Sequence, residues 1–157
     1  REVREFFDGP LALSGSISEG SSVLSALALG ADFAYVGTKF IATEEANASP
    51  GYKQMIIDST ADDIMYSATF TGVNGNYLRP SVEAAGLNPD EHMSGSKDDM
   101  NFSTSAIAKK DNSSKAWKDI WGSGQGIGSI KNAPSVEDAV NQMVSEYDEA
   151  KSRLESF

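Results

Sequence analysis

Two short apolar runs, each ending in a glycine turn, constrain the fold of this chain more than any other feature of its sequence. Residues 11–13 are apolar and lead into Ser14-Gly15-Ser16, while residues 33–36 are apolar and lead into Gly37-Thr38. Short apolar runs that end abruptly in small residues are typical of strands buried in a parallel sheet. We therefore predict two buried strands, over residues 11–14 and 33–36.

The segment between these runs has the pattern of one amphipathic helix. Ser21 or Ser22 can cap its start, and Gly30 stands where a left-handed residue commonly ends a helix. Its apolar residues at helical spacing are Val23, Leu24, Leu27 and Ala28. A crossover of this length joins parallel strands with a right-handed connection. We expect a helix over residues 22–29, packed on one face of two neighbouring parallel strands.

The turns at the carboxyl ends of these strands have the composition of an anion site. Gly15, Ser16, Gly37 and Thr38 are small, so their backbone N–H groups can converge on one anion. In eight-stranded α/β barrels, the loops after the seventh and eighth strands usually bind phosphate in this way. The spacing alone is equally consistent with two plain tight turns.

The amino-acid sequence around these turns resembles that of the nitronate monooxygenase family, formerly called 2-nitropropane dioxygenases. The matching stretches are SGSISEG, SALALGADFAYVGTKFIATEEA and, further on, WKDIWGSGQG. The chain departs from the family at Ser16, where a second glycine is common. The resemblance implies a flavin mononucleotide (FMN) enzyme on a barrel, with these cofactor-binding residues: Gly15, Ser16, Tyr35, Val36, Gly37, Thr38 and Gln125.

The resemblance also implies the reaction. Members oxidise alkyl nitronates with O2 to carbonyl compounds and nitrite, using a catalytic histidine on an earlier barrel strand. His92 is the only histidine here, and no family motif surrounds it, so we assign no catalytic residue to this chain. Two alternatives remain open: an FMN-dependent reductase of quinones or enoyl thioesters that uses NAD(P)H, and a non-catalytic phosphate-binding domain.

The length of the chain bears on the fold class. Its 157 residues are fewer than the roughly 250 of a complete barrel. We predict an α/β fold, the carboxyl-terminal portion of a TIM (β/α)8 barrel (its last two βα units) followed by a mainly helical tail. We expect three parts. Residues 1–48 form the last two βα units with the phosphate-binding loops, residues 49–134 form a helical and irregular excursion with a loop that returns to the barrel mouth, and residues 135–157 form a packing helix. The missing amino-terminal half of the barrel is then an expected partner.

Charge and composition exclude several classes of function. The formal net charge is −10, which argues against a nucleic-acid surface or an anionic membrane as partner. The chain has no cysteine, so it holds no disulfide or thiolate metal site, and we expect no metal site of another kind. No apolar run approaches the length of a membrane span, and a cytoplasmic protein is the expectation.

The rest of the chain gives weaker signals. Ser49-Pro50 begins a predicted helix, Asn74-Gly75 is a two-residue hairpin turn, and residues 80–85 form a short helix that stops at Gly86. Residues 88–114 are polar and predicted to form a long surface loop, either mobile or a lid over the barrel mouth. Ser135 opens the clearest helix, with predicted buried residues Val140, Met143, Val144 and Tyr147.

Overall fold

The computed structural model describes residues 1–68, 74–90 and 119–157. The chain divides into two compact units, one made of residues 1–58 with 126–157 and the other of residues 59–125. His92 and most of the predicted loop over residues 88–114 lie outside the described residues. The first unit contains both glycine turns.

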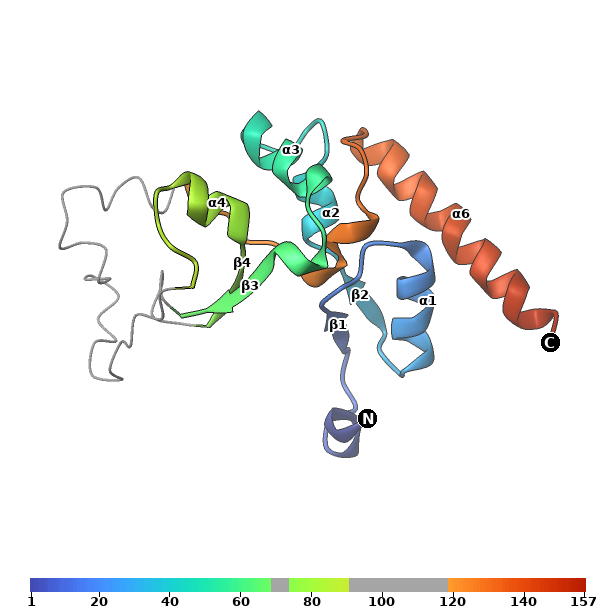
Figure 1. Cartoon of the computed structure of the whole chain (residues 1–157). Coiled ribbons are helices and arrows are strands. Elements are labelled where there is room, and N and C mark those ends of the chain that lie inside the picture. Colours follow the sequence, from blue (N-terminus) through green and yellow to red (C-terminus); the bar gives the residue numbers. More distant parts are fainter. Residues whose placement is uncertain (69–73, 91–118) are drawn as a thin grey trace. The chain divides into compact units, whose positions relative to one another are not determined.

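The first unit is built on the predicted pair of parallel strands. After a 3-10 turn, η1 (Glu2–Glu5), come β1 (Ala12–Ser14), α1 (Gly20–Ala28) and β2 (Phe33–Tyr35). The two strands pair in parallel with Ala12 opposite Phe33 and Ser14 opposite Tyr35, and α1 packs against β2 (Figure 1). The prediction of neighbouring parallel strands joined by a helix is confirmed.

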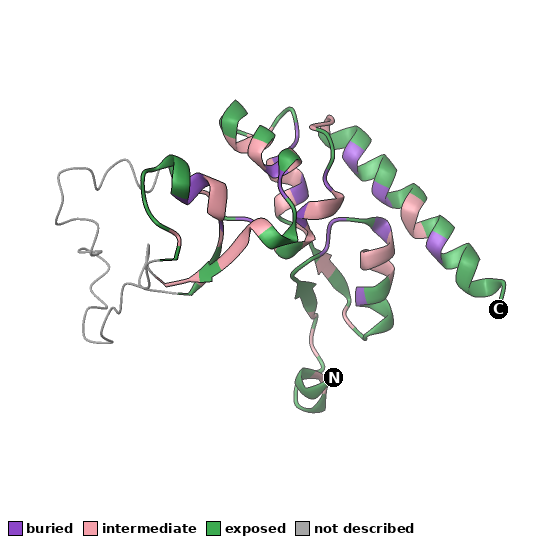
Figure 2. Cartoon of the chain, viewed as in Figure 1, coloured by how far each residue is buried: buried purple, intermediate pink, exposed green. Residues whose placement is uncertain are grey.

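The prediction that these strands are buried is wrong. All of β1 is exposed, and Phe33 and Tyr35 of β2 are 60% and 67% exposed (Figure 2). A parallel strand is buried only when strands flank both its edges and helices cover the sheet. Within the described residues, β1 and β2 are a complete two-stranded sheet, so each has one free edge. Alternation along the strand places Phe33 and Tyr35 on the same face of this sheet.

Helix α1 begins and ends through different contacts. Neither Ser21 nor Ser22 caps it: Glu19 is the N-cap residue, and the N–H of Gly20 donates to Glu146 Oε2 at 2.8 Å. At its other end Gly30 has φ +97°, as expected. The N–H groups of residues 30 and 31 donate back to the carbonyls of residues 27 and 26, which is the Schellman arrangement.

Helix α6 (Val136–Glu155) packs along α1. As predicted, Ser135 caps it by accepting the N–H of Asp138 at 3.0 Å. Met143 is buried, but the predicted burial of Val140 and Val144 is wrong, since they are 43% and 55% exposed. The buried residues of the helix are Ala139, Met143 and Ala150. At about 100° per residue these form one narrow stripe, and Val140 and Val144 lie to one side of it.

The same unit contains two further helices and a 3-10 segment. These are α2 (Thr38–Ile41), α3 (Pro50–Asp58) and η5 (Gln125–Ser129), the last of which begins at the boundary between the units. Ser49 Oγ accepts the N–H of Tyr52 at 3.2 Å, which confirms the predicted start of α3. The core of this unit includes fully buried Ile56 and Ile127.

The second unit is a hairpin with one helix. It contains η2 (Ala61–Asp63), β3 (Ile64–Ser67), β4 (Gly75–Leu78) and α4 (Arg79–Ala84). The strands are antiparallel with Ser67 opposite Gly75, so the predicted hairpin is present. The predicted two-residue turn at Asn74-Gly75 is wrong, because Gly75 lies inside β4 and pairs with Ser67. Gly86 has φ +77° and ends α4 as predicted.

A small core holds this second unit together. Val82 and Ile120 are buried against Met65 and Tyr77. The Ser81 hydroxyl donates to the Leu78 carbonyl at 2.7 Å and accepts the N–H of residue 121 at 3.0 Å. The segment around residue 121 is thereby attached to α4 and β4.

Candidate functional site

The turn after β1 has an unusual backbone. Gly15 has φ +105° and Ser16 has φ +54°, and Ser16 is the one residue other than glycine with positive φ among those described. Such a conformation costs about 1 kcal/mol or more in a residue with a side chain. This explains physically why a glycine suits the position of Ser16.

A segment from far along the chain supports this turn. A Cβ added to Gly126 would lie 2.5 Å from Ser18 Oγ and 3.0 Å from the carbonyl carbon and oxygen of Ser16. Ile127, the next residue of η5, is fully buried and fixes the segment in the core. Gly126 therefore approaches protein backbone closely. That the stretch 122–128 also reaches a flavin, and that Gln125 binds it, stay predictions.

The turn after β2 is open. Gly37 has φ −112° and ψ −74°, so its φ is not in the left-handed region that favours glycine. A Cβ added at Gly37, or at Gly15, would meet no atom of the described residues within 4 Å. In the part of the chain that the structure describes, no hydrogen bond uses the N–H groups of Ser16 or Gly37, whereas the pairing of Ser14 with Tyr35 engages the N–H of Gly15 in the sheet. Each turn therefore has a backbone N–H group without a partner among the described residues, that of Ser16 in one and that of Gly37 in the other.

The two turns lie at the same edge of the sheet. Ser14 and Tyr35 are the last paired residues of their strands, and Ser14 Oγ donates to the Tyr35 carbonyl at 3.3 Å. Paired strands are about 4.8 Å apart, so Gly15 and Val36 leave the sheet side by side. The structure brings residues 14–16 and 36–38 together. That these residues bind a cofactor stays a prediction.

One residue near the turns was missed by the sequence analysis. Lys39, the second residue of α2, is only 6% exposed, and Ala42 and Thr43 on the same face of the chain are 0% and 1% exposed. Lysine is seldom buried unless its charge is paired. A signal was available in the sequence, because Lys39 is the only basic residue between Arg4 and Lys53.

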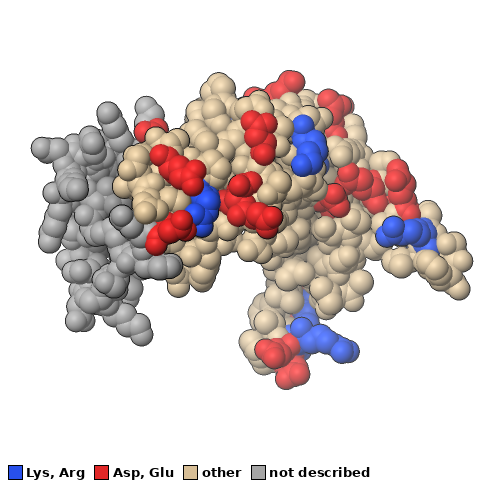
Figure 3. All heavy atoms as spheres, viewed as in Figure 1, with Lys and Arg blue, Asp and Glu red and all other residues tan. Residues whose placement is uncertain are grey.

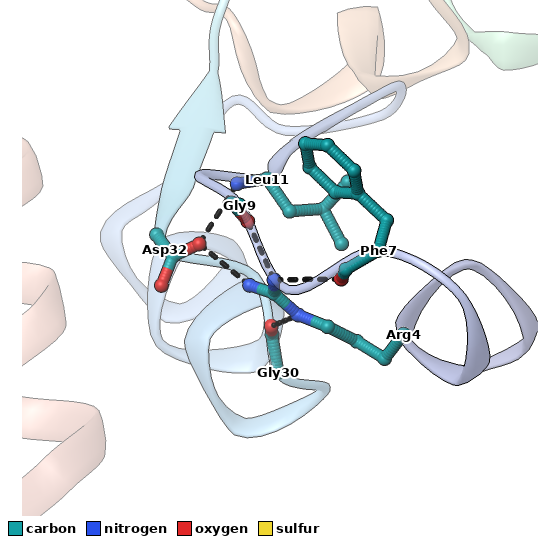
Figure 4. A network of polar contacts seen from close by, with 6 residues as sticks. All are labelled: Arg4, Phe7, Gly9, Leu11, Gly30 and Asp32. Carbon is teal, nitrogen blue, oxygen red and sulfur yellow. Dashed lines mark hydrogen bonds and ion pairs between the residues drawn. The ribbon is translucent and has the colours of Figure 1, made fainter.

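A separate polar network occupies the opposite, amino-terminal end of the two strands (Figure 4). Asp32 Oδ2 accepts the N–H of Leu11 at 2.8 Å and pairs with the guanidinium of Arg4 at 2.5 Å. The same guanidinium donates to the carbonyls of Gly30 at 3.0 Å and Gly9 at 2.7 Å. This network joins η1 to the start of both strands, so it has a structural role.

This network should make the stability of the protein depend on pH in the acid range. The hydrogen bond from Leu11 and then that from Arg4 lower the pKa of Asp32 below its ordinary value of 3.8. A lowered pKa means that the carboxylate stabilises the folded state above that value and loses its effect as the pH falls through the folded pKa. Asp32→Asn should therefore be less stable than the unchanged protein at pH 7, with a smaller difference at pH 3. Urea unfolding at both pH values measures this, and an equal difference at both would contradict it.

The described surface is acidic and offers no metal site. Acidic side chains are spread over the face drawn in Figure 3, with few basic ones between them. Across residues 1–68, 74–90 and 119–157, no three His, Cys, Asp or Glu side chains gather as metal ligands would. Each helix in those ranges is too short or too polar to cross a membrane.

Comparison with known proteins places this chain in a family. The model of the family "Nitronate monooxygenase" matches residues 1–146. A nitronate monooxygenase of Paraburkholderia phytofirmans is 31% identical over 80 residues, which cover 51% of this chain and 22% of that protein. The matched part is therefore a minor share of the relative's length.

Two solved structures resemble this chain in fold, and the chain again covers only part of their length. FabK from Thermotoga maritima matches with a TM-score of 0.72 at 23% identity, over 99% of this chain and 49% of that one. A nitroalkane oxidase from Streptomyces ansochromogenes matches with a TM-score of 0.67 at 25% identity, over 98% of this chain and 43% of that one. The chain spans less than half of each, so its fold is that of a partial barrel. With its family model matched over residues 1–146, the chain belongs to the nitronate monooxygenase family.

Proposed function

We propose that this chain is part of an FMN-dependent oxidoreductase that oxidises alkyl nitronates with O2 to carbonyl compounds and nitrite. Within it, the turns over residues 14–16 and 36–38 hold the phosphate of the cofactor. The observation that carries the proposal is the open space beside the backbone of Gly37. The φ of Gly37 lies outside the left-handed region and no described atom occupies the place of a side chain, so we infer that the glycine leaves space for a ligand.

The residues present fit a phosphate group. A phosphate monoester offers several acceptor oxygens, and free N–H groups at Ser16 and Gly37 supply donors at the carboxyl ends of adjacent strands. No atom of the described residues within 4 Å of a Cβ built at Gly15 or Gly37 obstructs the approach. When bound, the flavin ring supplies the two-electron chemistry. The part of these turns is to hold the cofactor by its phosphate so that the ring is fixed in orientation.

We assign the catalytic base and the other walls of the site to the missing amino-terminal half of the barrel, and this chain to the last two βα units. The exposed sheet supports this. Phe33 and Tyr35 are large apolar side chains on one uncovered face, and β1 and β2 each have a free edge within the described residues. Further strands would pair those edges and cover that face, as in a closed barrel. The chain by itself should then be inactive.

A second candidate function keeps the flavin and changes the substrate. It is the reduction of quinones or enoyl thioesters by NAD(P)H, and the match to FabK in fold is as good as the match to the nitroalkane oxidase. A third candidate is a non-catalytic phosphate-binding domain. Tyr35, Val36, Thr38 and Gln125 complete the proposed cofactor-binding set in either flavin enzyme.

Anaerobic reduction of the bound flavin separates the three candidates. The full-length protein that contains this chain is mixed with propyl-2-nitronate or with NADPH, and the bleaching of the flavin is followed by absorbance. Reduction by the nitronate, with nitrite release in air, is the expected result; reduction by NADPH alone supports the second candidate. A protein without flavin, or one that neither compound reduces, supports the third. Nitrite release by the 157-residue chain alone would overturn the assignment of the base to the other half.

A further inference from the structure

We propose that Lys39 is a phosphate-binding residue, whose ammonium pairs with the phosphate monoester held by the two turns. The inference rests on the proposed function. It adds one charged side chain to a phosphate site otherwise made of backbone N–H donors. It stands on the burial of Lys39, on its lack of a partner and on its place in α2.

Lys39 is buried without a partner of its own. It is 6% exposed, and within the described part of the chain no hydrogen bond or ion pair involves its side chain. In that same part, no fully buried side-chain nitrogen or oxygen lacks a partner. The ammonium must therefore keep some access to solvent while the aliphatic stem is buried. Such an ammonium is held in place and yet accessible to a ligand.

The usual orientation of long side chains on a helix supports the placement of the Lys39 ammonium near the Gly37 turn. Gly37 is the N-cap residue of α2, and Lys39 is the second residue after it. Long side chains on a helix lean back toward its amino-terminal end. For Lys39 that is the end where the open Gly37 turn lies, next to the turn at Gly15 and Ser16.

Electrostatics gives the pairing a reason. A phosphate monoester carries a charge of about −1.5 to −2 at neutral pH, and the chain already has a formal net charge of −10. Backbone N–H groups supply only partial positive charge. The neighbouring basic residues in sequence are engaged elsewhere, since Arg4 pairs with Asp32 and Lys53 Nζ donates to the Glu44 carbonyl at 3.0 Å. Lys39 is therefore the basic side chain in this stretch whose full positive charge is available to pair with a phosphate.

The test compares FMN with riboflavin, which lacks the phosphate. Dissociation constants are measured by quenching of flavin fluorescence in the full-length apoprotein, for Lys39→Met, Lys39→Arg and the control Lys53→Met. Methionine keeps the buried stem and removes the charge. We expect Lys39→Met to weaken FMN binding about tenfold or more and to leave riboflavin binding unchanged. Lys39→Arg should retain most of the affinity for FMN, and Lys53→Met should behave as the unchanged protein.

Two results would overturn the proposal: unchanged FMN binding in Lys39→Met, or equal weakening of FMN and riboflavin, which is the mark of a structural role. If Lys39→Met does not fold, as judged by circular dichroism, Lys39→Gln takes its place under the same criteria. Failure of the proposed function looks different. In that case the unchanged protein itself would bind riboflavin as well as FMN, or would bind neither, and Lys39 would then have no phosphate to bind.

Discussion

Replacing Gly20 by alanine should lower the free energy of unfolding by about 3 kcal/mol, at the upper end of the usual cost of overpacking. Gly20 is the first residue of α1 and lies against the backbone of α6. A Cβ added there would be 1.9 Å from the carbonyl oxygen of Met143 and 2.4 Å from the amide nitrogen of Tyr147. Both atoms belong to a continuous helix, so neither can move without displacing α6. Urea unfolding followed by circular dichroism measures the change.

The loss of stability expected for Gly20→Ala is opposite in sign to the effect of helix propensity. Within a helix, alanine is favoured over glycine by roughly 1 kcal/mol, so a helix free of close contacts would gain stability from the substitution. Gly128→Ala is the matched control, because a Cβ at Gly128 would meet no atom within 4 Å and its φ is not in the left-handed region. Equal stability of the two variants would mean that α1 and α6 are not packed as described.

The start of α1 shows where reasoning from sequence reaches its limit. Local signals predicted the strand, helix, strand order and the stop at Gly30, because a left-handed glycine acts within one turn of chain. The first residue of the helix was predicted too late, since its capping group comes from Glu146, 126 positions away. A contact of that separation leaves no local pattern around Ser21 or Ser22.

Helix α6 illustrates a second limit. Helical spacing of apolar residues and the serine before them predicted the helix and its cap, which depend on neighbouring residues. The same spacing could not tell which part of the apolar stripe faces α1. The residues buried on α6 are Ala139, Met143 and Ala150, while Val140 and Val144 are exposed.

The candidate site could be predicted in outline for the same reason. Gly15 and Gly37 were found because they end apolar runs, and parallel pairing then placed them at one edge. The left-handed Ser16, the support from Gly126 and the burial of Lys39 depend on tertiary contacts and were not predicted. The wrong prediction of buried strands has a similar cause. An apolar run indicates that a strand face packs against other residues, but it does not show which residues those are.

Substituting Gly37 tests the site with the least disturbance to the fold. At Gly15 the positive φ makes any side chain costly, so a loss of binding there would be ambiguous. Gly37 has φ −112° and open space around a built Cβ, so alanine and valine should fold with little change in stability. If the turns hold phosphate, these side chains occupy the space that the phosphate needs. We expect weaker FMN binding in Gly37→Ala and a further loss in Gly37→Val, by about tenfold or more in Kd, equivalent to about 1.4 kcal/mol.

The measurement is the flavin content of the purified full-length protein, together with the Kd for FMN and the midpoint of urea unfolding of the apoprotein. Ala28→Val is the control, since Ala28 is exposed in α1 and lies outside the two turns and outside residues 122–128. Loss of flavin with an unchanged midpoint in Gly37→Val, and full flavin content in Ala28→Val, is the result that supports a phosphate site. Full flavin content in Gly37→Val would remove the turn after β2 from the cofactor site. Loss of flavin together with a lowered midpoint would mean that glycine serves the fold at this position, and the main observation behind the proposed function would then fail.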